Sequence, residues 1–251
     1  MVDLHCHILP EIDDGAKNAD ESVELLKAEK SQRVKSIVFT PHFNFERTDI
    51  KSFCERRQRS LEILTSRKEF AESGISVKTG AEIFFSVQLN NEDLDPLCFE
   101  GTSYILVELP VNVRPYGLTH TLRAMLNRGY IPILAHVERY SYLASDPTVL
   151  YDLVSQGCLA QINCGALIKD SEKSSVAMKY LKWELAQLIS SDCHNIQKRK
   201  PNFKNAIEVV EGKLGRQYAE WLIKNGKDVF NGRYVDIPVM KKPKKVFGIW
   251  I

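Results

Sequence analysis

Short apolar runs alternate with amphipathic stretches along almost the whole chain, and this alternation constrains the fold more than any other feature. We interpret the apolar runs as strands over residues 2–7, 36–42, 76–85, 104–110, 131–138, 159–164 and 187–194. Helical patterns lie between them, over residues 19–33, 51–73, 117–128, 148–156 and 173–186. Strand–helix alternation predicts a parallel sheet. Several of the runs are nearly continuous in valine, isoleucine and leucine, which is typical of strands buried on both faces.

Seven such units in 251 residues fit a closed or nearly closed α/β barrel better than an open sheet. No Gly/Ser-rich or Pro-rich linker divides them, so we expect a single domain over residues 1–235. Residues 236–251 form a separate basic and apolar tail, with four lysines around Pro243. This tail could contact an acidic partner or a membrane surface. We favour the alternative that Phe247 and Trp250 dock on the body of the chain.

Composition excludes several classes of protein. The net charge is only +2, which supports neither nucleic-acid binding nor membrane binding. No apolar run approaches the roughly 20 residues of a membrane helix, so we expect no membrane insertion. The six cysteines have neither disulfide-scaffold nor zinc-ribbon spacing. We therefore expect free thiols in a reducing, cytoplasmic location.

Six of the seven predicted strands carry a histidine or an acid at or near their carboxyl ends. These residues are His5 and His7, His42, Glu82, Glu108, His136, and Asp192 with His194. In parallel barrels this end of the strands carries the active site. Side chains two residues apart on a strand share a face, so each close pair can reach one metal ion. A lone histidine at a strand end is more often solvated than a ligand, but the whole constellation predicts a metal site. The sixth histidine, His120, lies in a helical pattern and is interpreted as structural.

Several motifs resemble the PHP (polymerase and histidinol phosphatase) family. They are DLHCH, PEIDDG, TPH, GAEI, LVELP, LAHVERY and SDCHN, which occur in this order from Met1 to about Gly232. The combination of HVERY and IDDG resembles most the bacterial manganese-dependent protein-tyrosine phosphatases of capsule and exopolysaccharide loci, the CpsB/YwqE type. The resemblance implies a distorted (β/α)7 barrel that holds three divalent metal ions, with manganese expected and iron or zinc as alternatives.

The resemblance also implies a role for each site residue. His5, His7, Glu82 and Asp192 would hold the first metal, and Glu82 would bridge to a second one held by Glu108 and His136. Asp14, in preference to Asp13, would join His42 and His194 on the third. Arg139 and Arg199 would bind the substrate phosphate. The implied substrate is the phosphotyrosine-containing C-terminal tail of a membrane-bound tyrosine autokinase that controls polysaccharide synthesis.

The charges of this ligand set suit phosphate chemistry. Five neutral histidines and four carboxylates carry −4, and three divalent ions carry +6, which leaves +2 for a phosphomonoester dianion. We expect a metal-activated hydroxide to attack the phosphorus. The same site could serve a small-molecule phosphatase such as histidinol phosphatase.

A second mechanism must also be considered, because Cys193 and Arg199 have the Cys-x5-Arg spacing of thiol-based tyrosine phosphatases. The loop between them lacks glycine, and strand alternation turns Cys193 away from Asp192 and His194. We therefore expect the match to be accidental.

Overall fold

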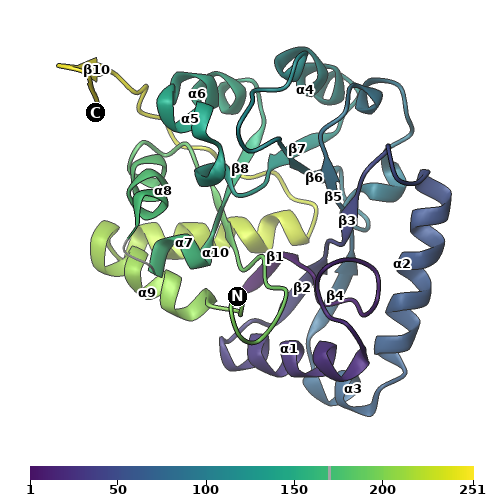
Figure 1. The fold of residues 1–251 in the computed structure, drawn as a ribbon. Coiled ribbons are helices and arrows are strands. Elements are labelled where there is room, and N and C mark those ends of the chain that lie inside the picture. The colour runs from purple at the N-terminus through teal and green to yellow at the C-terminus, as the bar shows by residue number, and fades with distance from the viewer. Residues whose placement is uncertain (169–170) are drawn as a thin grey trace.

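The computed structural model describes residues 1–168 and 171–251 and has parallel strands at its centre with helices around them (Figure 1). The central strands are β1 (Val2–Cys6), β2 (Ser36–Phe39), β3 (His42–Phe43), β4 (Ser76–Thr79), β5 (Glu82–Phe84), β6 (Tyr104–Glu108), β7 (Ile131–Leu134), β8 (Leu159–Asn163) and β9 (Leu188–Ser190). They form two parallel sheets with the orders β1-β2-β4 and β3-β5-β6-β7-β8-β9. The predicted parallel α/β architecture is confirmed.

Hydrogen bonds beyond the ends of β1 and β9 join the first strand to the last. The His7 N–H donates to Cys193 O at 2.9 Å, and the Asp192 N–H donates to His5 O at 2.8 Å. The seven predicted strand positions therefore follow one another in ring order, and His5, His7 and Asp192 lie at the junction.

Two predicted strands are each divided in two, at Pro41 between β2 and β3 and at Gly80 between β4 and β5. Proline has no N–H for a strand ladder. A Cβ at Gly80 would lie 2.7 Å from Cδ1 of Phe99, so glycine permits the close packing of that ring. Beyond the two breaks, β3 and β5 pair in the second sheet with His42 opposite Glu82. The interruptions therefore bring two predicted ligands into register.

The surrounding helices are α1 (Ala19–Ser31), α2 (Ile50–Thr65), α3 (Lys68–Ser73), α4 (Leu118–Asn127), α5 (Ser141–Ser145), α6 (Thr148–Ser155), α7 (Cys164–Ile168), α8 (Glu172–Lys182), α9 (Phe203–Leu214) and α10 (Arg216–Phe230), with 3-10 turns η1 (Val87–Asn90), η2 (Asp95–Leu97) and η3 (Val137–Arg139). The single helix predicted over 51–73 is two helices, α2 and α3. Asp49 caps α2 by accepting a 2.8 Å hydrogen bond from the Ser52 N–H. His120 lies exposed on α4, within the predicted helical stretch.

The tail forms a small hairpin of β10 (Lys245–Val246) and β11 (Ile249–Trp250) (Figure 1). Trp250 docks as predicted, since its Nε1 donates to Ser145 O at 2.9 Å. The docking predicted for Phe247 is wrong, because this side chain is wholly exposed at the turn of the hairpin. In the described part of the chain, no helix is both long and apolar enough to span a membrane.

Candidate metal centre

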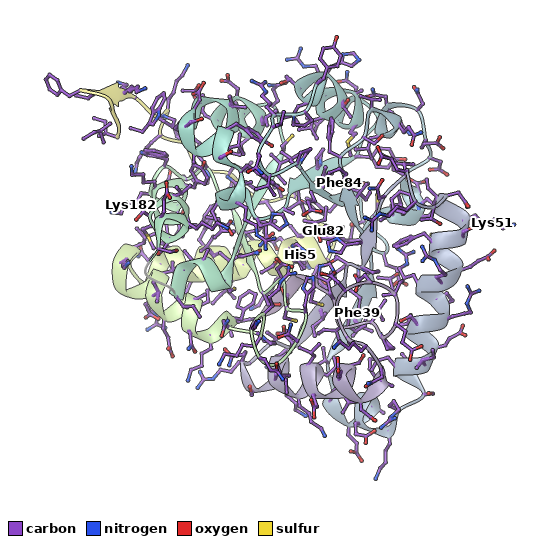
Figure 2. All side chains as sticks on the ribbon, viewed as in Figure 1. His5, Phe39, Lys51, Glu82, Phe84 and Lys182 are labelled. Atoms are coloured by element: carbon purple, nitrogen blue, oxygen red, sulfur yellow. The ribbon has the colours of Figure 1, made fainter. Side chains whose placement is uncertain are left out.

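The side chain of Glu82 lies at the centre of the predicted constellation, next to His5 (Figure 2). Its Oε2 atom lies 3.1 Å from His5 Nε2 and 3.2 Å from His7 Nε2. The same two nitrogens are each 3.5 Å from Asp192 Oδ1. These four residues are all buried, and they match the first predicted ligand group.

Glu82 also faces the second group. Its Oε1 lies 2.9 Å from His136 Nε2, which is 3.5 Å from Glu108 Oε1. The Oε2 atom lies 3.1 Å from His42 Nδ1 as well. Burial by itself would raise the pKa of Glu82, but the surrounding imidazoles outweigh burial and hold this pKa well below its ordinary value. Glu82 is therefore an ionised, central carboxylate that several donors share.

Asp14, His42 and His194 form the third predicted ligand group, which lies beside Glu82. Asp14 Oδ1 is 3.3 Å from both His42 Nε2 and His194 Nε2. Together with His7, these residues offer ligand atoms that all lie within 4.8 Å of one another. The Asp14 side chain is 64% exposed, so this group is the one nearest to solvent.

Asp13 has a different position from its neighbour Asp14. Its Oδ2 accepts from His7 Nδ1 at 2.7 Å and from the His42 N–H at 3.0 Å, while Oδ1 accepts from the Gly15 N–H at 2.9 Å. This contact occupies Nδ1 of His7 and leaves Nε2 to face the cluster. The geometry therefore makes Asp14 the candidate ligand and Asp13 the residue that orients His7.

Of the seven predicted strands, the one over residues 159–164 carried no predicted ligand, and its observed strand β8 contributes two amides. Gln161 Oε1 lies 3.1 Å from His5 Nδ1 and also accepts from the His136 N–H at 2.9 Å. Asn163 Nδ2 donates to Asp192 Oδ2 at 2.7 Å. Sequence reasoning missed both residues because neutral amides carry no charge signal. Strand parity was the one available signal, since residues 161 and 163 share a face.

The backbone is unusual at two of the predicted ligands. His136 has φ 34° and ψ 54°, and Asp192 has φ 51°. Residues other than glycine rarely adopt this left-handed conformation, which costs on the order of 1–3 kcal/mol. His136 lies two positions after the end of β7 and Asp192 two positions after the end of β9, so the strained turns place both side chains at the mouth of the barrel.

Arg139 and Arg199 both reach Asp192 at the edge of the cluster. Arg199 Nη2 lies 2.7 Å from Asp192 Oδ1, and Arg139 Nη1 lies 3.4 Å from Oδ2. Both guanidinium side chains are about one-third exposed and line a cavity of about 190 Å³. Glu138 also lines this cavity, and burial raises its pKa to about 7. Two fixed cations therefore border a space beside the carboxylate cluster.

The Cys193 side chain points away from the carboxylate cluster and its two arginines. Its buried thiol donates to Glu29 Oε1 at 3.4 Å. The backbone N–H groups of His194 and Asn195 donate to Arg199 O, at 2.9 and 3.3 Å. The amides that a thiol-based mechanism would use to bind phosphate are thus engaged within the loop itself. This geometry contradicts the alternative thiol mechanism.

Residues 1–231 match the family of capsular polysaccharide synthesis proteins CpsB/CapC. The chain belongs to this family. It is 32% identical to CapC of Staphylococcus aureus over 99% of this chain and all of that protein. It is 28% identical to the tyrosine-protein phosphatase YwqE of Bacillus subtilis over the full length of both.

A solved structure is also consistent with membership of the CpsB/CapC family. A structure reported with YwqE from Bacillus subtilis and CpsB from Streptococcus pneumoniae, described as metal-dependent tyrosine phosphatases, aligns with a TM-score of 0.85 and 26% identity. The alignment covers 97% of this chain and all of the other. An organophosphorus hydrolase aligns with a TM-score of 0.53 at 10% identity, which shows a shared fold only.

Proposed function

We propose that this CpsB/CapC family member is a metal-dependent protein-tyrosine phosphatase. The observation that carries the proposal is the convergence of five imidazoles and four carboxylates on one mouth of the barrel, beside two arginines. Related proteins with this fold are named tyrosine-protein phosphatases. A metal-dependent hydrolase for phosphoric monoesters uses both features, a cation-binding cluster and fixed donors for phosphate oxygens.

The nitrogen and oxygen atoms of the cluster are suited to binding divalent cations, because their hydrogen bonds to one another leave some of them without a partner in the part of the chain that the structure describes. Among the described residues, the buried Glu82 Oε2 and His194 Nε2 lack a hydrogen-bond partner although charged or polar neighbours surround both. Oxygen and imidazole ligands without cysteine fit Mn²⁺, Fe or Zn²⁺. We propose three ions, held by His5, His7, Glu82 and Asp192, by Glu82, Glu108 and His136, and by Asp14, His42 and His194. We expect manganese to be the native metal.

The chain's own residues would position the substrate. Divalent cations supply Lewis acidity, which withdraws charge from phosphate oxygens and makes water a stronger nucleophile at neutral pH. Arg139 and Arg199 border the cluster and can donate paired hydrogen bonds to the remaining phosphate oxygens. Asn163 holds Asp192 on the side opposite to its contact with Arg199. A phenolate leaving group, with a pKa of about 10, departs more readily than an alkoxide.

We further propose that the substrate is the phosphorylated tail of a membrane-bound tyrosine kinase in capsule or exopolysaccharide synthesis. The family's description as capsular polysaccharide synthesis proteins supports this assignment. A barrel-mouth site suits a flexible tail, because the tail can enter without any domain unfolding. We place the reaction in the cytoplasm, where reducing conditions would maintain the free cysteines of the chain.

Hydrolysis of a phosphotyrosyl peptide tests the proposal. We expect activity that is lost after chelation and restored by Mn²⁺, together with three metal ions per chain by elemental analysis. His136→Ala should remove the activity, because it deletes an imidazole from the cluster. Cys193→Ser should retain it, since a hydroxyl can still donate to Glu29.

Two results would overturn the assignment. Activity that survives chelation but disappears in Cys193→Ser would establish a thiol mechanism. Rapid hydrolysis of histidinol phosphate with no turnover of phosphotyrosyl peptides would make the protein a small-molecule phosphatase that uses the same metals.

A further inference from the structure

A second and larger cavity, of about 690 Å³, borders the candidate metal cluster and shares no lining residue with the cavity beside Arg139 and Arg199. It lies between the loop after β3 and the first turns of α2, which flanks the strand ends (Figure 1). Asp14, His42 and Glu108 form its inner end, so it joins the cluster directly. Phe84 contributes an apolar wall, with the buried Phe43 behind it. A substrate held at the cluster has room here for the atoms that follow the phosphate.

Two arginines, Arg47 and Arg56, border the outer end of this cavity. Both are exposed, and within the described ranges neither guanidinium has a hydrogen-bond or ionic partner. Other arginines near the site are engaged. Arg57, one residue further along α2, donates to Gly80 O at 2.7 Å and to Pro96 O at 2.9 Å. Arg47 and Arg56 therefore present two uncommitted cations to whatever enters the cavity.

The negative charges of the cavity do not neutralise these cations. Its acids are Asp13, Asp14 and Glu108, and all three contact histidines of the cluster or lie in a candidate ligand group. Once divalent cations bind there, the acids are compensated at the inner end. The outer end then remains positive, which favours an anion.

We infer that this cavity is a substrate subsite in which Arg47 and Arg56 bind an anionic group next to the phosphotyrosine. The inference rests on the proposed function and deepens it, because it assigns a substrate preference to the same site. The recognised group is a carboxylate or a second phosphoryl group on the peptide, since a guanidinium binds either through paired hydrogen bonds. Phe84, which is partly exposed, provides apolar surface for the chain between the two anions.

Binding of nonhydrolysable peptides tests the subsite without turnover. Three peptides would carry a phosphonate analogue of phosphotyrosine, flanked by neutral residues, by glutamate, or by phosphoserine. Their Kd values for the Mn²⁺-loaded protein would be measured by fluorescence anisotropy. We expect both anionic peptides to bind more tightly than the neutral one by roughly 3- to 30-fold, towards the upper end of the range for two exposed ion pairs. The ratio between glutamate and phosphoserine identifies the preferred source of the anion.

The double variant Arg47→Gln/Arg56→Gln should remove the preference for anionic peptides. Arg59→Gln is the matched control, because Arg59 is exposed on the same helix but does not line the cavity. The control should keep the preference, and higher salt should weaken it in the wild-type protein. Equal Kd values for the three peptides, or an unchanged preference in the double variant, would overturn the subsite.

Turnover of p-nitrophenyl phosphate by the wild-type protein is measured separately. It reports on the proposed function alone. A protein that hydrolyses this small ester but binds all three peptides equally would retain the proposed function and lose the subsite. A protein that prefers anionic peptides without hydrolysing any ester would retain the anion-binding cavity and lose the proposed function.

Discussion

Replacing Asp13 with asparagine tests how this chain orients a metal ligand. The carboxylate accepts three hydrogen bonds, from His7 Nδ1, the His42 N–H and the Gly15 N–H. An asparagine side chain has one acceptor oxygen. If that oxygen faces His7 and His42, the amide N–H₂ faces the Gly15 N–H, and two donors oppose each other. The variant therefore loses at least one hydrogen bond and the negative charge that the Asp13 carboxylate places beside His7.

The size of the effect on metal binding follows from the loss of the charged hydrogen-bond partner of His7. A hydrogen bond to a charged group contributes about 1.5–3 kcal/mol. Loss of such a partner behind a ligating histidine lowers metal affinity by about 10- to 100-fold. We expect Asp13→Asn to weaken metal binding within this range without reducing the number of ions bound at saturation. Asp14→Asn should instead remove one ion, because the geometry makes Asp14 a ligand.

Calorimetric titration with Mn²⁺ and elemental analysis at saturation would measure both quantities for the two variants and the wild type. Circular dichroism would check that both variants fold. Wild-type affinity in Asp13→Asn would refute the argument that this carboxylate prepares His7 for metal binding. Loss of an ion in Asp13→Asn but not in Asp14→Asn would show that the two roles are reversed.

Three further results are expected. Gly15→Ala should lower the free energy of unfolding by about 1–3 kcal/mol in a urea titration, because the added Cβ would lie 2.6 Å from His7 Cβ. Burial raises the pKa of Glu29 well above its ordinary value of 4.5, so its contribution to stability is full below that pH and declines as pH rises towards the folded pKa. Glu29→Gln should therefore reduce the loss of stability measured between pH 5 and 8. Asp13 and Glu82 outweigh the opposing effect of burial and raise the pKa of His7 to about 10, and Asp14, Glu82 and Asp13 likewise raise the pKa of His42 to about 11. Metal binding at pH 7 should thus release a proton from each histidine, which calorimetry in buffers of different ionisation enthalpy would count.

The carboxyl ends of the strands were the most predictable part of this protein. A polar residue at the end of a buried apolar run is visible in the sequence, and parallel strands bring such ends to one mouth. Strand parity also predicted that Cys193 points away from Asp192 and His194, as its contact with Glu29 shows. These inferences needed only the period of a strand and the direction of the chain.

Roles that depend on loop geometry were less predictable. Asp13 and Asp14 are adjacent and chemically identical, so only the path of the loop after β1 places one on His7 and the other beside His194. Gln161 has no charge and lies in an otherwise apolar run, yet it contacts both His5 and the backbone of His136. Local pattern cannot report such contacts, because they depend on residues more than 20 positions apart.

The breaks in two strands explain why the cluster centres on Glu82. An uninterrupted strand over residues 76–85 would remain beside β2 along its whole length. Instead, Gly80 admits the Phe99 ring, and the Glu82 N–H donates to Pro41 O at 3.1 Å as the chain enters the second sheet. Glu82 then lies opposite His42 on one side and Leu106 of β6 on the other. From this position its two oxygens reach histidines from β1, β3 and the end of β7. The irregularity of the barrel is therefore what allows a single carboxylate to face all three ligand groups.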